Sequence, residues 1–318
     1  MDIPTSPAQA NELSISLEEC LSQLAAGTFA FGQLAAFSDL SRENLHAVEM
    51  VWPTIDAATR HRLIAEAVDL AEENVQYRFD RLCRLAVRDP DAEVRQLAVA
   101  GLWEDETRSL LEEMIDIARH DESIDVRAAA IALLGDALVR LQDDQSESDL
   151  VDQIGDMVLE FAANERETAM VRRRAVEAVG ALKQNDRTRE AILDAYQHGD
   201  ATLEAGALVA MGRSLESRWR TIVRAALISE DPEVRFEAAR ALGAIGTSDD
   251  VPDLSELTLE DDTDIRQAAI AALGEIGGPG AIRVLRNLSR QAHDGDDEAI
   301  NDAVDAAQLG SDPLQFRP

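Results

Sequence analysis

Apolar residues recur along this chain with the spacing of an α-helix. In "DPEVRFEAARALGAIG", residues 231–246, Val234 is followed by alanine four and five residues on, by leucine at eight and by glycine at nine. Positions 0, 4, 5 and 8 lie on one face of an α-helix, so the stretch predicts a helix with one buried face. Counting from Val234 as position 0, we use the same numbering for similar stretches elsewhere.

The pattern occurs six times, with alanine at +4 in every copy, and a degenerate seventh copy surrounds Ala299. Position 0 is occupied in turn by Val94, Val126, Val171, Leu203, Val234 and Ile265. The copies are 31 or 32 residues apart, except for a step of 45 residues between Val126 and Val171. A fixed period of this size predicts a repeat architecture.

A second amphipathic stretch lies between the copies, for example at residues 107–120, 151–164 and 217–229. Each repeat is therefore expected to be a helical hairpin. One hairpin cannot bury its apolar face alone, so the hairpins must stack on one another. The pattern predicts an all-α fold, an α-solenoid (superhelix) of about seven hairpins over residues 74–310.

Both ends of the repeated helix carry recognisable residues. Asp89-Pro90 and Asp231-Pro232 each predict an N-cap aspartate followed by proline in the first helical position, where the missing N–H does no harm. Glycine at +9 predicts a left-handed C-cap. Alanine at +4 leaves no large side chain between neighbouring helices, which predicts close packing.

The remaining segments lack the motif. Residues 13–73 contain helical patterns and are expected to form an N-terminal helical cap. Their most apolar part, residues 24–37, predicts a buried helix or, alternatively, a membrane or partner contact, since it is too short and too interrupted to span a bilayer. The polar run at 143–149 predicts an acidic loop insertion. Residues 1–12 and 311–318 are expected to be a disordered N-terminus and a C-terminal tail.

The line D-P-x-V-R-x-x-A-x-x-A-L-G at residues 231–243 and its copies resemble the HEAT-repeat family, in particular the short-repeat subgroup named after phycobilisome lyases. The resemblance covers residues 75–309. It implies that the arginine at +1 reaches an aspartate in a neighbouring turn and forms a ladder along the stack, broken at Glu204. The residues expected in this ladder are Asp89, Arg95, Asp121, Arg127, Asp231, Arg235 and Arg266.

Charge narrows the choice of partner. The chain has 62 acidic and 30 basic residues, a net charge of −32. This balance argues against nonspecific nucleic-acid binding and against an anionic membrane surface, since both need basic residues. A large net charge also keeps proteins soluble and monomeric, so we expect a monomer. Lys183 is the only lysine, a bias that salt adaptation or a GC-rich genome would each produce.

The two cysteines, Cys20 and Cys83, cannot form a disulfide framework, which favours a reducing, cytoplasmic environment and a structural role for both thiols. The N-terminus has no basic region before an apolar stretch, so we expect no signal peptide.

No catalytic or metal-binding motif stands out. The five histidines lack the spacing of metal ligands, and HExxH, Walker A and G-x-S-x-G are absent. Deoxyhypusine hydroxylases, which are HEAT-like, bind iron through His-Glu pairs, and this chain has no His-Glu dipeptide. The acidic runs at 143–149 and 294–298 do not match a calcium-binding EF-hand loop. We therefore expect no metal and no cofactor. The resemblance leaves a cofactor-handling enzyme of the bilin-lyase type as an alternative, although no catalytic residue can be assigned.

One window of the chain has a different charge balance. Residues 166–240 hold 13 bases and 12 acids, whereas the remaining residues carry a net charge of −33. The resemblance implies that the second helix of each hairpin lines a concave surface, with positions +2, +3 and +6 pointing into it. Arginine together with an aromatic residue is typical of an interface hot spot. The predicted partner-binding residues are Arg172, Arg173, Arg174, Glu177, Phe236 and Arg240.

The sequence therefore predicts a non-catalytic scaffold or adaptor that binds a protein partner in this groove. We expect the partner to present an acidic or phosphorylated segment. The alternative is that these arginines pair with acids of adjacent repeats and have no binding role.

Overall fold

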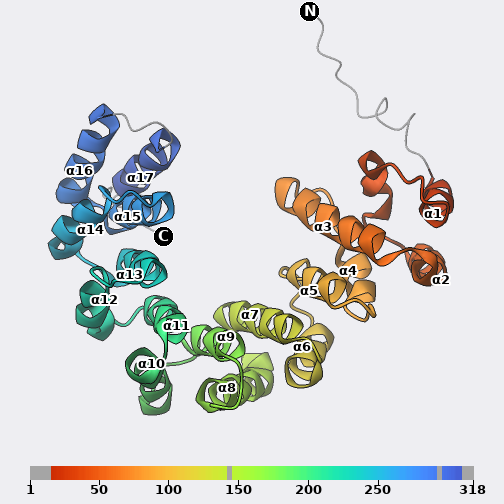
Figure 1. Ribbon diagram of the computed structural model, residues 1–318, viewed down its shortest axis with the longest axis horizontal. Helices are drawn as coiled ribbons and strands as arrows, with labels where there is room; N and C mark the ends of the chain where they lie inside the picture. Colours follow the sequence, from red (N-terminus) through yellow and green to blue (C-terminus); the bar gives the residue numbers. More distant parts are fainter. Residues whose placement is uncertain (1–15, 142–144, 292–295, 310–318) are drawn as a thin grey trace, which may run out of the picture. The chain divides into compact units, whose positions relative to one another are not determined.

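The computed structural model describes residues 16–141, 145–291 and 296–309, and all regular structure in these ranges is helical (Figure 1). The chain divides into two compact units, residues 1–133 and 134–318. The helices that begin in the first unit are α1 Leu17–Ala25, η2 Phe31–Phe37, α2 Arg42–Val51, η3 Trp52–Thr54, α3 Ala57–Glu73, α4 Asp80–Ala86, α5 Ala92–Ala100, α6 Arg108–His120 and α7 Ile124–Leu141.

The second unit begins within α7. Its further helices are η4 Gln145–Glu147, α8 Ser148–Ala163, α9 Ala169–Val179, α10 Asp186–His198, α11 Ala201–Arg213, η5 Ser217–Trp219, α12 Arg220–Ala226, α13 Pro232–Ile245, η6 Ser248–Asp250, α14 Val251–Leu257, α15 Thr263–Ile276, α16 Gly278–Gln291 and α17 Asp297–Leu309.

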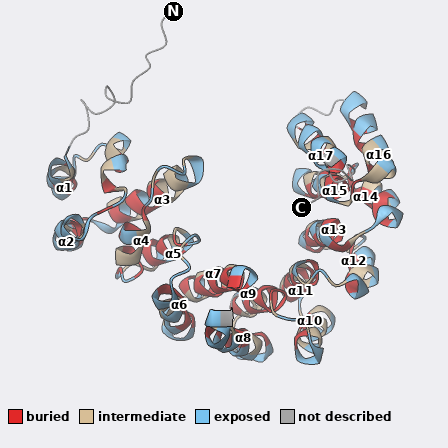
Figure 2. Ribbon diagram, turned by 180° about the vertical axis from the view of Figure 1, so that it is seen from behind, coloured by how far each residue is buried: buried red, intermediate tan, exposed pale blue. Residues whose placement is uncertain are grey.

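Successive helices pack as hairpins: α4 with α5 in the first unit, and α8 with α9, α10 with α11, α12 with α13, α14 with α15 and α16 with α17 in the second. Helices α6 and α7 follow α5 in the same alternation along the chain. In the second unit the second helix of each hairpin packs on the next, in the order α9, α11, α13, α15, α17. The buried residues of these helices face one another (Figure 2). The prediction of an all-α solenoid of about seven hairpins is confirmed.

Alanine at +4 is fully buried in all six copies of the pattern. All six alanines, at 98, 130, 175, 207, 238 and 269, have no exposed surface at all. Protein interiors are packed as densely as organic crystals, so a larger side chain at any of these sites would displace a neighbouring helix.

Glycine at +9 has a role other than the predicted left-handed cap, and that prediction is wrong. Gly212, Gly243 and Gly274 lie inside their helices. Gly212 and Gly243 lie against the alanine at +7 of the following repeat: a Cβ on Gly243, for example, would come within 3.0 Å of Cα of Ala272. Gly274 lies in the same way against Ala303 of α17. The same approach recurs at Gly135 and Gly180. The glycine therefore brings two helix backbones together.

The N-cap predicted at Asp231 is confirmed, whereas the one predicted at Asp89 is wrong. Asp231 is the N-cap of α13 and Pro232 its first residue, as predicted. The N-cap of α5, however, is Asp91 and not Asp89. Asp91, Asp231 and Asp262 all stand at −3, and a side-chain oxygen there accepts hydrogen bonds from the first free N–H groups of the helix. Asp89 stands two residues earlier, at −5.

The apolar stretch at residues 24–37 is not one helix, so that expectation is wrong. Helix α1 ends at Ala25, Gly27 adopts a left-handed conformation (φ +68°), and a separate 3-10 helix covers Phe31–Phe37. Glycine just after a helix end is the usual residue for that conformation, which explains the break. Leu34 and Phe37 are nevertheless buried, so the stretch does contribute to the core.

The predicted tails at 1–12 and 311–318 lie outside the described residues, as does the start of the predicted acidic insertion. From residue 145 onward that insertion is a short 3-10 turn leading into α8. No helix in the described ranges is long and apolar enough to cross a lipid bilayer.

Candidate functional site

The arginine at +1 first of all holds the loop that precedes its own helix. Nη1 of Arg95, Arg127, Arg235 and Arg266 donates a hydrogen bond to the backbone carbonyl at −5 of the same repeat, at 2.8–3.1 Å. Charged donors make stronger hydrogen bonds than neutral ones, so each arginine fixes the turn between two helices.

Three of these arginines also reach an acid in the next repeat. Nε and Nη2 of Arg95 bind both carboxylate oxygens of Asp121, at 2.9 and 2.8 Å. Arg235 lies 3.3 Å from Glu260, and Nε of Arg266 donates to Asp296 at 2.6 Å. Asp121 and Glu260 stand at −5 of their repeats. An acid at −5 therefore identifies where two repeats are joined by an ion pair.

The structure contains one more ion pair between neighbouring hairpins, which the sequence pattern did not predict. Arg60 of α3 lies against Asp89, with Nε 2.7 Å from Oδ2, and Asp89 also accepts a 2.7 Å hydrogen bond from Nε1 of Trp52. Both charged side chains are buried. Leu63, Ile64 and Ala67 would mark α3 as one more copy, but leucine replaces alanine at +4, so a search for that alanine does not find it.

The joints in the middle of the chain have no carboxylate at −5. This position is occupied there by Arg166, His198 and Ser229. Arg172 donates to the carbonyl of Ala162 instead. Position +1 of the next copy is Glu204, whose pKa is raised by burial and by the charge of Asp231. Asp231 is therefore a helix cap and, in place of the ladder role predicted for it, lies near another acid.

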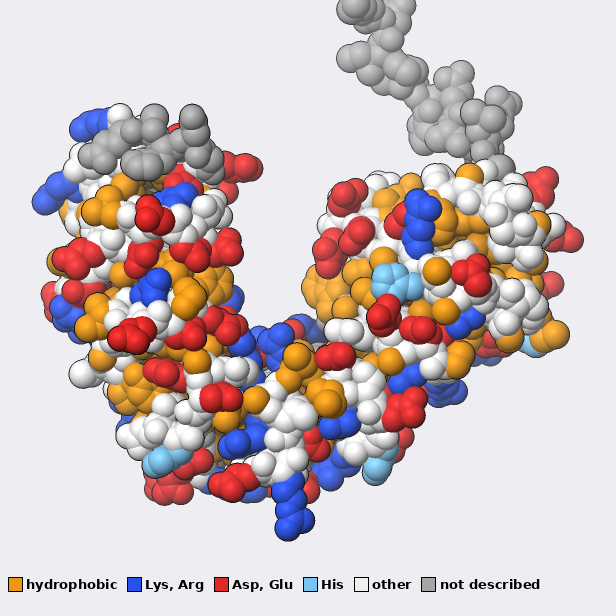
Figure 3. Space-filling view, in the orientation of Figure 1, with side chains coloured by type: hydrophobic (Ala, Val, Ile, Leu, Met, Phe, Trp, Pro, Cys, Tyr) orange, Lys and Arg blue, Asp and Glu red, His pale blue; other side chains and the backbone are white. Residues whose placement is uncertain are grey.

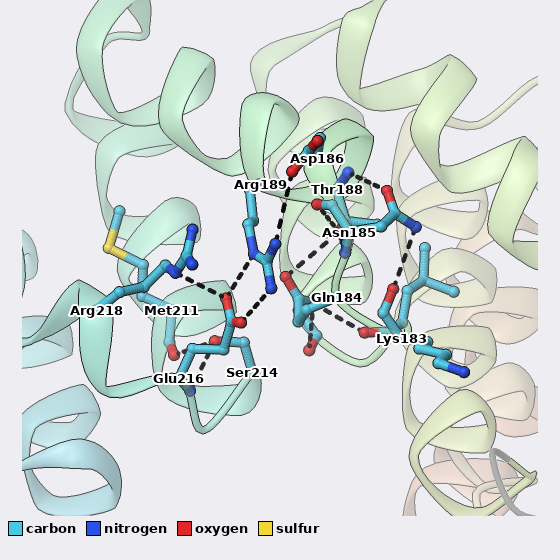
Figure 4. Close-up of polar contacts among 12 residues, drawn as sticks. Lys183, Gln184, Asn185, Asp186, Thr188, Arg189, Met211, Ser214, Glu216 and Arg218 are labelled. Atoms are coloured by element: carbon cyan, nitrogen blue, oxygen red, sulfur yellow. Dashed lines mark hydrogen bonds and ion pairs between the residues drawn. The ribbon is translucent and has the colours of Figure 1, made fainter.

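The first helices carry a second series of ion pairs, shown for one joint in Figure 4. Arg189 of α10 binds both oxygens of Glu216, in the turn before α12, at 2.9 and 2.5 Å, and this lowers the pKa of Glu216. Arg218 approaches the same carboxylate at 3.7 Å. Equivalent pairs join Arg84 to Asp105 and Arg220 to Asp250. The sequence pattern of the second helices gives no sign of this series.

A groove of about 780 Å³ lies within the second unit, along the second helices of four consecutive hairpins. Its walls are formed by residues at equivalent places of α9, α11, α13 and α15, together with the turn after α11. The lining residues are Arg174, Glu177, Val209, Gly212, Arg213, Leu215, Phe236, Glu237, Arg240, Ala241, Ala244, Asp264, Gln267, Ala268, Ala271, Ala272 and Glu275.

Four of the predicted partner-binding residues line this groove: Arg174, Glu177, Phe236 and Arg240. The other two do not. Arg172 points to the backbone of α8, as described above. The guanidinium of Arg173 runs under the groove and lies 2.8 Å from Glu177, 2.5 Å from Glu233 and 3.7 Å from Glu237.

The arginines of this region are balanced by glutamates. Arg174 lies 2.7 Å from Glu177, and Arg240 lies 3.1 Å from Glu237. Glu177 and Glu237 are both buried, and burial raises the pKa of Glu237. The third arginine of the groove wall, Arg213, lies 2.7 Å from Asp136. The arginines of the groove wall are therefore all held in ion pairs.

Gly206 makes the Arg173 contacts possible. A Cβ at Gly206 would stand 2.8 Å from Cγ of Arg173, so the arginine of α9 crosses the backbone of α11 on its way to Glu233 and Glu237 of α13. Three successive hairpins are thus fixed beneath the groove by one side chain.

The groove also exposes apolar surface. The guanidinium of Arg240 lies over the ring of Phe236, 5.6 Å from its centre. Leu215 is 70% exposed and has a left-handed backbone (φ +53°), a conformation that is strained for a leucine. Strained backbone of this kind is concentrated at functional sites. Burial does not account for leucine here, because the side chain faces solvent at the edge of the groove.

Metal binding and thiol reactivity find no site in the described ranges. No group of three or more His, Cys, Asp or Glu side chains there could hold a metal ion. Cys20 and Cys83 are both buried, and burial raises the pKa of Cys83 to about 12, far from a reactive thiolate. Acidic, basic and apolar side chains are interspersed over the face seen in Figure 3.

Comparison with known families supports the repeat assignment. A family model for HEAT repeats matches residues 190–269 and 221–306. No match is found among curated proteins.

Solved structures with a similar arrangement include the Escherichia coli protein YibA, with 17% identity over 97% of this chain and 99% of that chain (TM-score 0.42). The complex of CpcE and CpcF of phycocyanin lyase from Nostoc sp. PCC7120 matches at 15% identity over 72% of this chain and 94% of that chain (TM-score 0.48). Human deoxyhypusine hydroxylase matches at 14% identity over 92% and 96% (TM-score 0.31).

Proposed function

Since residues 190–306 of this chain match a model for HEAT repeats, we propose that the protein is a non-catalytic scaffold that binds a protein partner in the groove along α9, α11, α13 and α15. The observation that carries the proposal is the strained, exposed Leu215 at the edge of a groove whose arginines are all held by acids. A rigid framework beside exposed apolar and aromatic side chains is what a protein interface needs.

The ion pairs beneath the groove support the proposal in a second way. Glu177, Arg173 and Glu237 fix the relative positions of α9 and α13 before any partner arrives. A surface that is already ordered loses little entropy on binding, so more of its contact energy appears as affinity. The proposal includes a cytoplasmic location for the protein, which the two cysteines favour.

Groove-filling variants test the proposal. Ala271 and Ala244 are exposed alanines of the groove wall. The tryptophan side chains of Ala271→Trp and Ala244→Trp should therefore fill the groove without disturbing the core. Ala225→Trp is the matched control, because Ala225 is an exposed alanine of α12 outside the groove. We expect affinity capture from native lysate, read by mass spectrometry, to recover one polypeptide with wild type and the control but not with the groove variants.

Leu215→Gly gives an independent test that does not depend on filling the groove. Glycine adopts the left-handed conformation without strain, so the variant should stay folded while it loses the exposed side chain. Weaker capture together with an unchanged or higher melting temperature would support the proposal. A partner retained equally by Leu215→Gly and both tryptophan variants would place binding elsewhere on the chain.

A further inference from the structure

The charged side chains on the two walls of the groove differ in whether they are paired. As described above, each arginine of the wall has an acid as its partner. The opposite wall, α15, carries Asp264 and Glu275. Among the described residues, neither carboxylate makes a hydrogen bond or a close ion pair, and both are exposed.

Both acids face the same way along α15. They are 11 residues apart, which is close to three turns of an α-helix, so both side chains project from one face. The Glu275 carboxylate lies over α13, where a Cβ on Gly243 would come within 2.5 Å of Oε2. Burial raises the pKa of Glu275, and the charge of Arg240 lowers it to a smaller extent. A cation from a partner would compensate this desolvation.

We propose that the groove selects a basic, apolar segment of its protein partner, with two Lys or Arg side chains on Asp264 and Glu275 and an apolar residue against Leu215 and Phe236. The inference rests on the proposed function and changes the partner expected from sequence. An acidic or phosphorylated segment would find the groove arginines already paired with acids and would meet two carboxylates that make no close ion pair.

The geometry also fixes a spacing. At a rise of about 1.5 Å per residue, the Cα atoms of Asp264 and Glu275 are about 16 Å apart along the helix. An extended chain rises about 3.3 Å per residue, so the two basic residues of a peptide lying along α15 should be about five residues apart. A peptide bound as a helix would instead need about 11 residues between them.

The experiment uses the full chain and an oriented library of fluorescein-labelled 12-residue peptides, in which one position at a time is fixed as Arg, Lys, Leu, Glu or phosphoserine. Selected peptides are then measured individually by fluorescence anisotropy. The test variant is Asp264→Asn combined with Glu275→Gln. The control is Glu256→Gln combined with Asp305→Asn, which removes the same charge from exposed sites outside the groove.

We expect wild type and the control to select Arg or Lys at two positions about five apart, and the test variant to bind those peptides about tenfold more weakly, as removal of a complementary charge pair does. Selection of Glu or phosphoserine, or equal binding by the test variant, would overturn the inference. If capture recovers a partner that Ala271→Trp abolishes while the library shows no preference for basic residues, the inference fails and the scaffold function stands.

Two further outcomes also bear on the inference. If sedimentation shows a dimer that Ala271→Trp abolishes, the groove is occupied by a second copy of this chain, and the inference fails. If neither capture nor the library yields binding that depends on the groove, the inference and the proposed function fail together.

Discussion

Asp89 offers the sharpest test of how the repeats are joined. Its carboxylate has no exposed surface, and it accepts hydrogen bonds from Nε1 of Trp52, from Nη2 of Arg60 at 3.1 Å and from the backbone N–H of Asp91 at 2.9 Å. Asp89→Ala would leave Arg60, whose side chain is only 9% exposed, without its counter-charge. Removing one partner of a buried pair typically costs about 3–5 kcal/mol, and the orphaned Trp52 N–H adds about 1–3 kcal/mol.

These terms overlap, because both donors lose the same acceptor, so we expect a loss of about 4 kcal/mol in the free energy of unfolding of residues 1–133. At about 2 kcal/mol per molar urea, the midpoint of urea unfolding should fall by about 2 M, as followed by far-UV circular dichroism. Asp89→Asn keeps the shape and some hydrogen bonds and should lie between the alanine variant and wild type.

Asp80 provides the control. It pairs with Arg78 at 2.9 Å, but the two side chains are 34% and 63% exposed. Exposed pairs contribute at most about 1 kcal/mol, so Asp80→Ala should hardly move the midpoint. If Asp89→Ala were no more costly than Asp80→Ala, the idea that buried arginine–acid pairs hold the repeats together would be refuted.

Three other predictions concern packing, pH and thiol reactivity. Gly180→Ala would place its Cβ 2.6 Å from Cα of Ala210 and should lower the melting temperature, with an overpacking cost of about 1–3 kcal/mol. Gly155→Ala, whose Cβ would meet the side chain of Leu182 at 3.1 Å, should be neutral or stabilising. Equal effects of the two variants would contradict the close-approach argument. Because the pKa of Glu237 is raised, its protonated form favours the folded state, and its contribution to stability falls as pH rises through the window between its ordinary and raised pKa. Glu237→Gln should therefore gain melting temperature relative to wild type as pH rises from 4 to 7, and a difference that stays constant with pH would contradict the assignment. Cys83 should react with Ellman's reagent at pH 8 only after unfolding, since it is buried and its pKa is about 12; rapid reaction in the native protein would show that the thiol is accessible.

The sequence predicted the fold well because its strongest signal is periodic. Alanine at +4 and the apolar residues around it specify one face of a helix, and that information is local. The N-cap at Asp231 was predictable for the same reason, since the cap bonds lie within three residues of the aspartate.

Features that depend on contacts between repeats were harder to predict. Gly180 is close to the end of a helix, and nothing in its local sequence distinguishes a cap from a close approach to Ala210. Likewise, the charge window left open whether its arginines bind an acidic partner or pair with acids of adjacent repeats, because a count of charges does not show that Arg173 reaches Glu233, 60 residues away. The groove acids Asp264 and Glu275 fall outside that window, so its charge balance gave no indication of them.

The glycine at +9 and the alanine at +7 have a consequence for how such a chain can evolve. The glycine of each repeat packs against the repeat that follows, and the alanine packs against the repeat before it. A duplicated block of 31 residues would therefore meet its own copy through an interface that already exists. The array can gain or lose whole repeats by gene duplication or deletion without a new surface having to arise. A deletion that removed part of a second helix would instead set two unlike surfaces against each other.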